Sequence, residues 1–323
     1  MFLNLNVKDF FKDELTLDES VILTLAFFSH IKRPLNLVEL KEFLWRRVES
    51  SENILEVLNK LLLKKKITSS RLKVKNDEIY YTIFADKDIF DFYESNLQIR
   101  ENLLKRAHQA NHLIKWIPFI KGIYLCNSLA FDTAKQSSDI DFFIVTKTKR
   151  MFLARAIITL VLSLFNLRRH DDKVAGQVCL SYYVTEDNMD LIKTKITNDI
   201  HLVYWIANMK TMYKSIDLLD IRHHNVWIKH YLPNIDTHNT PKLYTLPPIV
   251  TYVVHFFLEI ILEILFLAPI FNTMSEILQV KRAKNKMKKL SEKAKNIVTD
   301  KMLKFHDQDR REEHRDVWMK TLI

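Results

Sequence analysis

Glycine is almost absent from this chain, which contains only two glycines among 323 residues. Glycine adopts left-handed backbone conformations more readily than any other residue, so tight turns here must be built from other residues. Only seven prolines interrupt the chain, and 48% of its residues are hydrophobic. The composition therefore predicts a helix-rich globular protein, and the length predicts two or three domains.

The chain is basic, with a formal net charge of +10 and a pI near 9.3. This charge favours acidic partners such as nucleic acid, nucleotide phosphates or anionic lipid, although a solvated basic surface is an equally good explanation. Cys126 and Cys179 each lie within an apolar run, which predicts buried, reduced thiols. Residues 1–12 lack a basic leader and a small-residue cleavage site. We therefore expect a cytoplasmic protein.

The first 86 residues have the pattern of a winged helix-like module. Apolar spacing predicts helices at 16–31, 37–48 and 54–62, and the alternating segments 66–75 and 78–84 predict a β-hairpin. Three helices followed by a hairpin are typical of a winged helix, so residues 1–86 form the first predicted domain.

The predicted hairpin is strongly basic, because no acidic residue occurs between Leu61 and Asn76. Lys66, Arg71, Lys73 and Lys75 are the residues that we expect to contact nucleic acid phosphates. Winged helices also serve as protein-docking modules, in which these lysines would only keep the surface hydrated. The sequence leaves both alternatives open.

The middle of the chain alternates between helix and strand patterns. Residues 87–117 are predicted to form a helical linker, and residues 118–195 an α/β core. Within this core we expect strands and one helix in the order strand 119–126, strand 139–146, helix 150–167 and strand 177–184. Residues 196–323 form the last predicted region, which is helical, with the segment 196–219 among its helices.

Two carboxylates fall within the second of these strands. The two-residue period of a strand places Asp139 and Asp141 on one face and Ile140 and Phe142 on the other. Two like charges at one point of an apolar strand repel each other unless a cation or a proton holds them together. A divalent metal ion is therefore the expected ligand of the pair.

The segment 123–145 resembles the signature of the DNA polymerase beta-type nucleotidyltransferase superfamily. In that signature a hydrophobic strand ends in a Gly-Ser pair and is followed, after a spacer of this length, by Asp, a hydrophobic residue and Asp. Further segments are similar to an uncharacterised bacterial group in which such a domain follows a winged helix: 128–130, 137–141, 179–183, 225–227, 232–234 and 303–306.

The resemblance implies Mg²⁺-dependent transfer of a nucleoside monophosphate from a nucleoside triphosphate, with ATP as the first candidate donor. Asp139 and Asp141 would bind Mg²⁺ and carry the catalysis, while Ser128 and neighbouring backbone amides would hold the triphosphate. The other residues that we expect to bind the nucleotide are Asn127, Ser138 and Lys147. Lys147 is also compatible with a solvated loop lysine.

The sequence departs from the superfamily pattern at two positions. Asn127 replaces the glycine, and asparagine is the non-glycine residue that best tolerates a left-handed conformation. Ser181 occupies the place at which many members carry a third carboxylate. The alternative function is therefore a catalytically degenerate protein that binds nucleic acid or protein as a regulator.

An apolar segment at 249–271 is long enough to suggest a membrane span. His255, Glu259 and Glu263, however, recur every four residues along one stripe, and two glutamates in a bilayer would be costly. We therefore expect a buried helix with one polar edge. Residues 281–295 contain eight basic residues against one acidic residue, so peripheral membrane contact remains an alternative.

Overall fold

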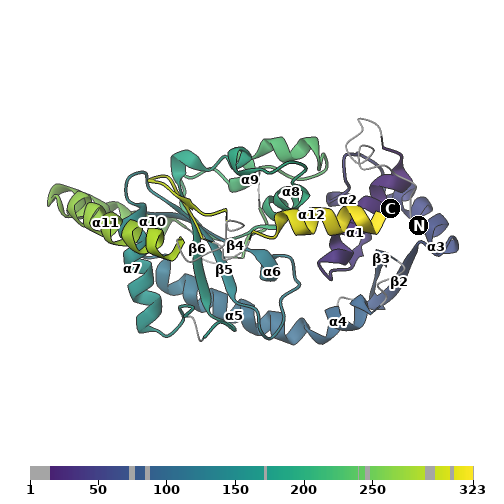
Figure 1. The fold of residues 1–323 in the computed structure, drawn as a ribbon, viewed down its shortest axis with the longest axis horizontal. Coiled ribbons are helices and arrows are strands. Elements are labelled where there is room, and N and C mark those ends of the chain that lie inside the picture. Colours follow the sequence, from purple (N-terminus) through teal and green to yellow (C-terminus); the bar gives the residue numbers. More distant parts are fainter. Residues whose placement is uncertain are drawn as a thin grey trace.

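The computed structural model describes residues 15–72, 77–83, 88–170, 173–238, 240–243, 248–287, 295–305 and 309–322. It is an α+β protein that is rich in helix, as predicted, with one antiparallel and one mixed β-sheet. Figure 1 shows the smaller sheet and its helices at one end, the mixed sheet in the middle, and a helical pair at the other end.

The N-terminal part contains α1 (Leu17–His30), β1 (Leu35–Asn36), α2 (Leu37–Glu42), α3 (Ser51–Leu63), β2 (Ile67–Leu72) and β3 (Glu78–Ile83). The strands form an antiparallel sheet in the order β1-β3-β2. Capping boxes begin two of the helices, because Thr16 pairs reciprocally with Glu19 and Asn36 with Glu39. Helix α2 ends at Glu42, earlier than the predicted Val48.

A pair of helices, α4 (Ile89–Ser95) and α5 (Leu97–Ile114), connects this part to the mixed sheet. There the chain forms β4 (Ile120–Cys126), α6 (Asn127–Ala130), β5 (Ile140–Thr146), α7 (Met151–Leu164) and β6 (Val178–Thr185). Strands β4 and β5 are antiparallel, whereas β5 and β6 are parallel and are connected through α7. These elements begin and end within a few residues of their predicted bounds.

The C-terminal region is not purely helical, and the prediction of helix through 196–219 is wrong. Helix α8 (Ile200–Asn208) is followed by β7 (Lys210–Lys214), and β8 (Ile297–Val298) and β9 (Met302–Lys304) follow later. The sheet order is β7-β4-β5-β6-β9-β8. These strands are too short to reveal a two-residue period, and pairing with distant strands determines their conformation. Short helices connect these elements. The 3-10 helices Glu186–Asn188 and Ile192–Thr194 lie between β6 and α8, and α9 (Ile221–His224) and the 3-10 helix Val226–His230 follow β7.

The mixed sheet has a hydrophobic core on each face. Phe142 and Ile144 of β5 pack on the side of α5 and α7, whereas Phe143 and Val145 pack on the side of α8 and the N-terminal part. Helix α12 (Arg311–Leu322) returns along that second side and lies next to α1 (Figure 1). There the buried Trp318 donates a hydrogen bond from Nε1 to the carbonyl of Leu23 at 3.0 Å.

The apolar segment at 249–271 forms two helices rather than one. Helix α10 (Pro248–Ile264) and helix α11 (Leu267–Met287) meet at a bend of 85°. No single helix in the described ranges has the length and apolar character needed to cross a membrane, although the bent pair meets both conditions jointly. The prediction of a buried helix is wrong, because most large apolar side chains of α10 are exposed.

Candidate functional site

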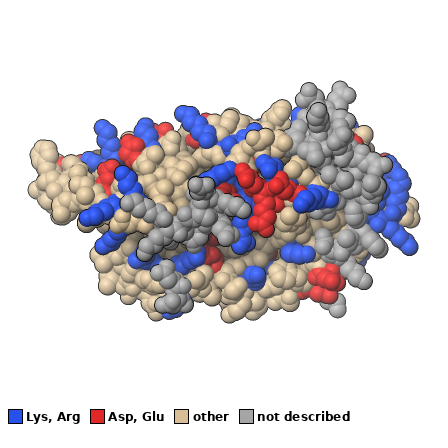
Figure 2. Space-filling view, viewed as in Figure 1, with Lys and Arg blue, Asp and Glu red and all other residues tan. Residues whose placement is uncertain are grey.

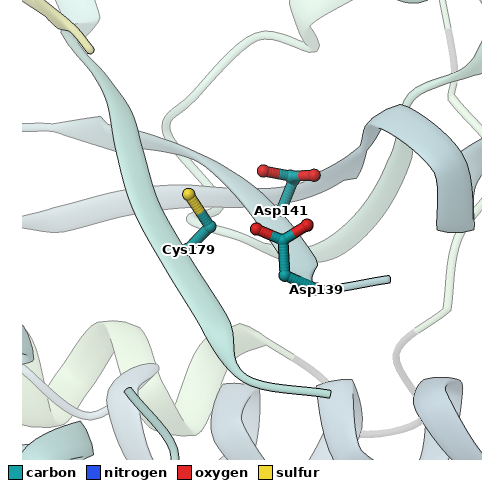
Figure 3. Close-up of side chains that lie close together, drawn as sticks. All are labelled: Asp139, Asp141 and Cys179. Carbon is teal, nitrogen blue, oxygen red and sulfur yellow. The ribbon is translucent and has the colours of Figure 1, made fainter. Parts of the chain in front are cut away.

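Asp139 and Asp141 converge at the start of β5. Asp139 directly precedes the strand, Asp141 is its second residue, and the alternation of the strand directs both carboxylates to the same side. Cys179 of β6 lies opposite Asp141 in the parallel register. One ligand atom from each of these three residues lies within 4.8 Å of the others, and Figure 3 shows the three side chains close together where β5 begins beside β6.

Burial makes this pair of carboxylates costly to ionise. Asp141 is only 9% exposed. Its burial, and secondly the neighbouring charge of Asp139, raise the pKa of Asp141 to about 7. Arg169, from the loop after α7, compensates part of the charge, because its Nη1 lies 2.7 Å from Oδ2 of Asp139. The site is therefore built to hold positive charge.

Cys179 is a site residue that the sequence analysis did not identify. Burial and the charge of Asp141 raise the pKa of its thiol to about 12, so the thiol is neutral at pH 7. The sequence comparison placed Ser181 at the position of the third carboxylate, whereas the register of β6 places Cys179 directly beside Asp141. The register between β5 and β6 shifts directly after this pair, between Asp141 and Phe143 of β5, and spacing along the sequence does not reveal such a shift.

Asn127 has the left-handed conformation that the sequence predicts, with a φ of 54°. Oδ1 of its side chain accepts a hydrogen bond from Nε1 of Trp205 at 2.6 Å, and the same side chain acts to lower the pKa of Asp141, against the effect of burial. Trp205 lies on α8, far from Asn127 in the sequence. Asn127 therefore connects the turn after β4 to the carboxylate pair.

The other predicted nucleotide-binding residues are not all in one place. Ser128 follows Asn127 and lines the same hollow. Ser138 directly precedes Asp139, but its Oγ accepts a hydrogen bond from the backbone N–H of Lys135 at 3.1 Å and so stabilises the preceding turn. Lys147 follows the opposite end of β5, where its Nζ lies 2.9 Å from Oε2 of Glu259. The structure therefore does not bring Lys147 to the aspartates.

A hollow of about 530 Å³ opens on the side of the Asn127–Ser128 turn. The aromatic residues Phe131, Tyr182 and Trp205 line it, together with cationic groups from several elements: Lys32, Lys135, Lys304, Arg310 and Arg311. Some of these cations already have partners, because Arg311 and Lys304 both pair with Asp309. The hollow combines flat apolar surfaces with positive charge, and it meets the candidate site at Asn127 and Ser128 rather than at Asp139 or Asp141.

A second hollow, of about 660 Å³, lies at the start of β6 between α7 and α11. Cys179 and Ser181 form one wall, and His170 and four arginines lie around them: Arg155, Arg168, Arg169 and Arg282. Among its described lining residues there is no carboxylate, and Nε of Arg155 is buried without a hydrogen-bond partner. This hollow is chemically suited to an anion.

The predicted nucleic acid contacts are described only in part. Arg71 is exposed, with Nη1 3.3 Å from Oδ2 of the equally exposed Asp77, and Lys66 directly precedes β2. Lys73 and Lys75 lie outside the described residues. Figure 2 shows Lys and Arg side chains gathered at the end of the molecule where α3 lies.

The residues present are compatible with Mg²⁺. This ion prefers oxygen ligands and retains several water or phosphate ligands, so Asp139 and Asp141 suffice as its protein ligands. A neutral thiol is a poor ligand for Mg²⁺, whereas a softer ion would also recruit Cys179. No protein family model, curated protein or solved structure matches this chain.

Proposed function

We propose that this protein is a Mg²⁺-dependent nucleotidyltransferase, located in the cytoplasm, that transfers a nucleoside monophosphate from a nucleoside triphosphate to an acceptor. ATP is the first candidate donor. The observation that carries the proposal is the convergence of Asp139 and Asp141 at the start of β5, next to the left-handed turn at Asn127.

The topology around this point supports the proposal. A nucleotidyltransferase core needs the carboxylate strand between the strand that ends in the phosphate-binding turn and the strand that follows the crossover helix. Strands β4, β5 and β6 occur in this order, with α7 as the crossover. Likewise, the order α1, β1, α2, α3, β2, β3 supports a winged helix at the N-terminus.

In this proposal the residues around the carboxylates have separate roles. Asp139 and Asp141 hold Mg²⁺, which when bound neutralises charge on the phosphates and the leaving pyrophosphate. The backbone at Asn127 and Ser128 orients the triphosphate, and the aromatic walls of the adjacent hollow accommodate the base. The arginine-lined hollow beside Cys179 binds an anionic acceptor.

The test is a transfer assay with α-labelled ATP, Mg²⁺ and a panel of nucleic acid, protein and phosphorylated small-molecule acceptors. We expect label transfer by the unmodified chain and a loss of at least 100-fold in Asp139→Asn and Asp141→Asn. These substitutions keep the shape of the side chain while removing the charge that binds the metal. The matched control is Asp217→Asn, an ion-paired aspartate on the loop after β7.

Equal transfer by the unmodified chain and the Asp139→Asn variant would contradict the proposal, because the carboxylates would then have no part in the reaction. Absence of transfer to every acceptor, together with binding of Mg²⁺-ATP that Asp141→Asn abolishes, would instead favour the second candidate function.

That second candidate is a catalytically degenerate nucleotidyltransferase fold that acts as a nucleic acid- or protein-binding regulator. Three observations favour it: Arg169 already neutralises Asp139, Trp205 holds the side chain of Asn127, and the residue of β6 paired with Asp141 is Cys179, a thiol rather than a carboxylate. Its nucleic acid contacts would be Lys66, Arg71, Lys73 and Lys75. Double-stranded DNA should then bind with an affinity that falls steeply with salt, and charge reversal at Arg71 should weaken binding.

A further inference from the structure

Along most of the helical pair α10–α11, one stripe of polar side chains faces the rest of the protein, and most large apolar side chains are exposed. On α10 the stripe His255, Glu259 and Glu263 contacts the rest of the protein. Glu259 accepts hydrogen bonds from the backbone N–H of Phe119 and from Nζ of Lys147, both at 2.9 Å. Glu263 binds the guanidinium of Arg150 through two hydrogen bonds of 2.8 and 2.6 Å.

Helix α11 repeats this arrangement against α7. Oδ1 of Asn272 accepts a hydrogen bond from the backbone N–H of Leu153 at 3.1 Å. Gln279 donates to the carbonyl of Phe152 at 2.8 Å and accepts from Arg155 at 2.7 Å. Polar side chains thus fasten both helices to the core, which is the reverse of the usual amphipathic packing in a water-soluble domain.

The outward face is apolar over a large area. More than half of the exposed large apolar side chains in the described chain belong to residues 249–278. Along α10 they occur at 249, 250, 253, 256, 257, 258, 260, 261 and 264, which at 100° per residue covers an arc of about 200°. Phe266, at the bend, is 71% exposed and has a left-handed φ of 54°. A patch of this extent marks an interaction surface.

Basic residues directly follow this apolar surface. Lys281, Arg282 and Lys284 on the last turns of α11 are exposed. In Figure 2 the projecting end where α10 and α11 lie is mostly uncharged, and Lys and Arg side chains gather beside it. At the surface of a bilayer, an apolar face can contact the acyl chains while the cations beside it contact anionic headgroups.

From these observations we infer that the outward face of α10–α11 docks onto an anionic membrane surface. A groove in a protein partner or a second copy would cover one stripe of a helix, whereas lipid contacts an apolar arc of more than half the circumference. The length and composition of the bent pair also suit a bilayer. The inference does not depend on the proposed catalysis. Helix α11 also lines the arginine-lined hollow beside Cys179, so docking of α11 would bring that hollow close to the headgroups.

The experiment is flotation of the full chain with vesicles of phosphatidylcholine alone or mixed with phosphatidylglycerol. We expect binding to the anionic vesicles and at least a tenfold loss of bound protein in the triple variant Phe257→Glu, Ile264→Glu and Ile277→Glu. The matched control, Val38→Glu, Leu63→Glu and Val226→Glu, changes equally exposed apolar residues elsewhere and should bind normally. Circular dichroism checks that each variant is folded.

A second variant tests the role of the charges. Lys281→Glu, Arg282→Glu and Lys284→Glu should remove the preference for anionic over neutral vesicles. The inference is overturned if the unmodified chain binds neither type of vesicle, or if the apolar triple variant binds as well as the control. A dimer in solution that the apolar triple variant dissociates, without vesicle binding, would show that a second copy covers the face.

Discussion

Arg169 and Asp139 form an ion pair of 2.7 Å between Nη1 and Oδ2 at the centre of the candidate site. The guanidinium thus already neutralises one of the two carboxylates that would hold a metal ion. Asp141, its more deeply buried neighbour, has a pKa raised to about 7 by burial and by the charge of Asp139. Arg169 and a divalent cation therefore compete for the same negative charge.

Replacing Arg169 with alanine should tighten Mg²⁺ binding about tenfold, because a charge-assisted hydrogen bond no longer has to be broken. Isothermal titration with MgCl₂ alone measures this effect. Arg168→Ala is the matched control, since Arg168 lines the second hollow as Arg169 does, whereas the ion pair with Asp139 is made by Arg169. This variant should leave the affinity for Mg²⁺ unchanged. Unchanged or weaker Mg²⁺ binding in Arg169→Ala would show that the guanidinium and the metal do not compete.

A second prediction concerns the left-handed backbone of Asn127, whose φ is 54°. Asn127→Ala and Asn127→Gly both remove the hydrogen bond to Trp205, so the difference between them reports on the backbone alone. We expect the alanine variant to be less stable than the glycine variant by about 1 kcal/mol in urea unfolding. The same pair of substitutions at Asn166, where φ is 53°, should give a similar difference away from the site. Equal stability of the two Asn127 variants would argue against a left-handed turn.

Local sequence patterns predicted the helices, the hairpin and the strands around the aspartates, because each of these elements has its own period and capping residues. The left-handed turn at Asn127 was predictable for the same reason, since the conformational preference of asparagine is local. Residues brought in by distant elements could not be predicted. Trp205 comes from α8, and Arg169 reaches Asp139 from a loop whose path the sequence does not reveal.

Strand β7 and the pair α10–α11 show two further features of the fold that local sequence patterns cannot predict. The five residues of β7 become a strand only by pairing with β4. For α10 the sequence predicts the polar stripe but not the direction in which it faces, because a helix with one polar stripe has the same sequence whether that stripe faces water or the protein. The partners Lys147 and Arg150 decide the direction, and only the fold brings them to α10.

Histidines at the junction of α1, α8 and α12 should make stability depend on pH. Nε2 of His30 lies 2.9 Å from Nδ1 of His314, and the ring of His201 stacks on His314 with centroids 4.8 Å apart. Burial, and secondly the charge of His30, lower the pKa of His314 from 6.5 to about 4. Burial likewise lowers the pKa of His201. Charged groups from β9, from α12 and from the two residues before α12 surround this cluster: Lys304, Asp309, Arg310, Arg311 and Glu313.

Between pH 6.5 and 4 the unfolded chain binds a proton at His314 that the folded chain does not bind. The free energy of unfolding should therefore fall as the pH drops through this window, by about 2 kcal/mol from His314. Urea unfolding at several pH values measures this effect. In His314→Gln the free energy of unfolding should fall less steeply as the pH drops, while the exposed control His112→Gln should show the same pH dependence as the unmodified chain. An identical slope in His314→Gln and the unmodified chain would contradict the prediction.

The last prediction compares the two glutamates that fasten α10. Glu259 is buried and satisfies both a backbone N–H and Lys147, so Glu259→Ala should lower the free energy of unfolding by about 3 kcal/mol. Glu263 is more exposed, and Glu263→Ala should cost about 1 kcal/mol. Glu259→Gln retains an acceptor for the N–H of Phe119, so its loss of free energy of unfolding should lie between the losses of the two alanine variants. If Glu259→Ala costs no more than Glu263→Ala in urea unfolding, α10 does not dock through its polar stripe, and its apolar face then has no reason to point outward.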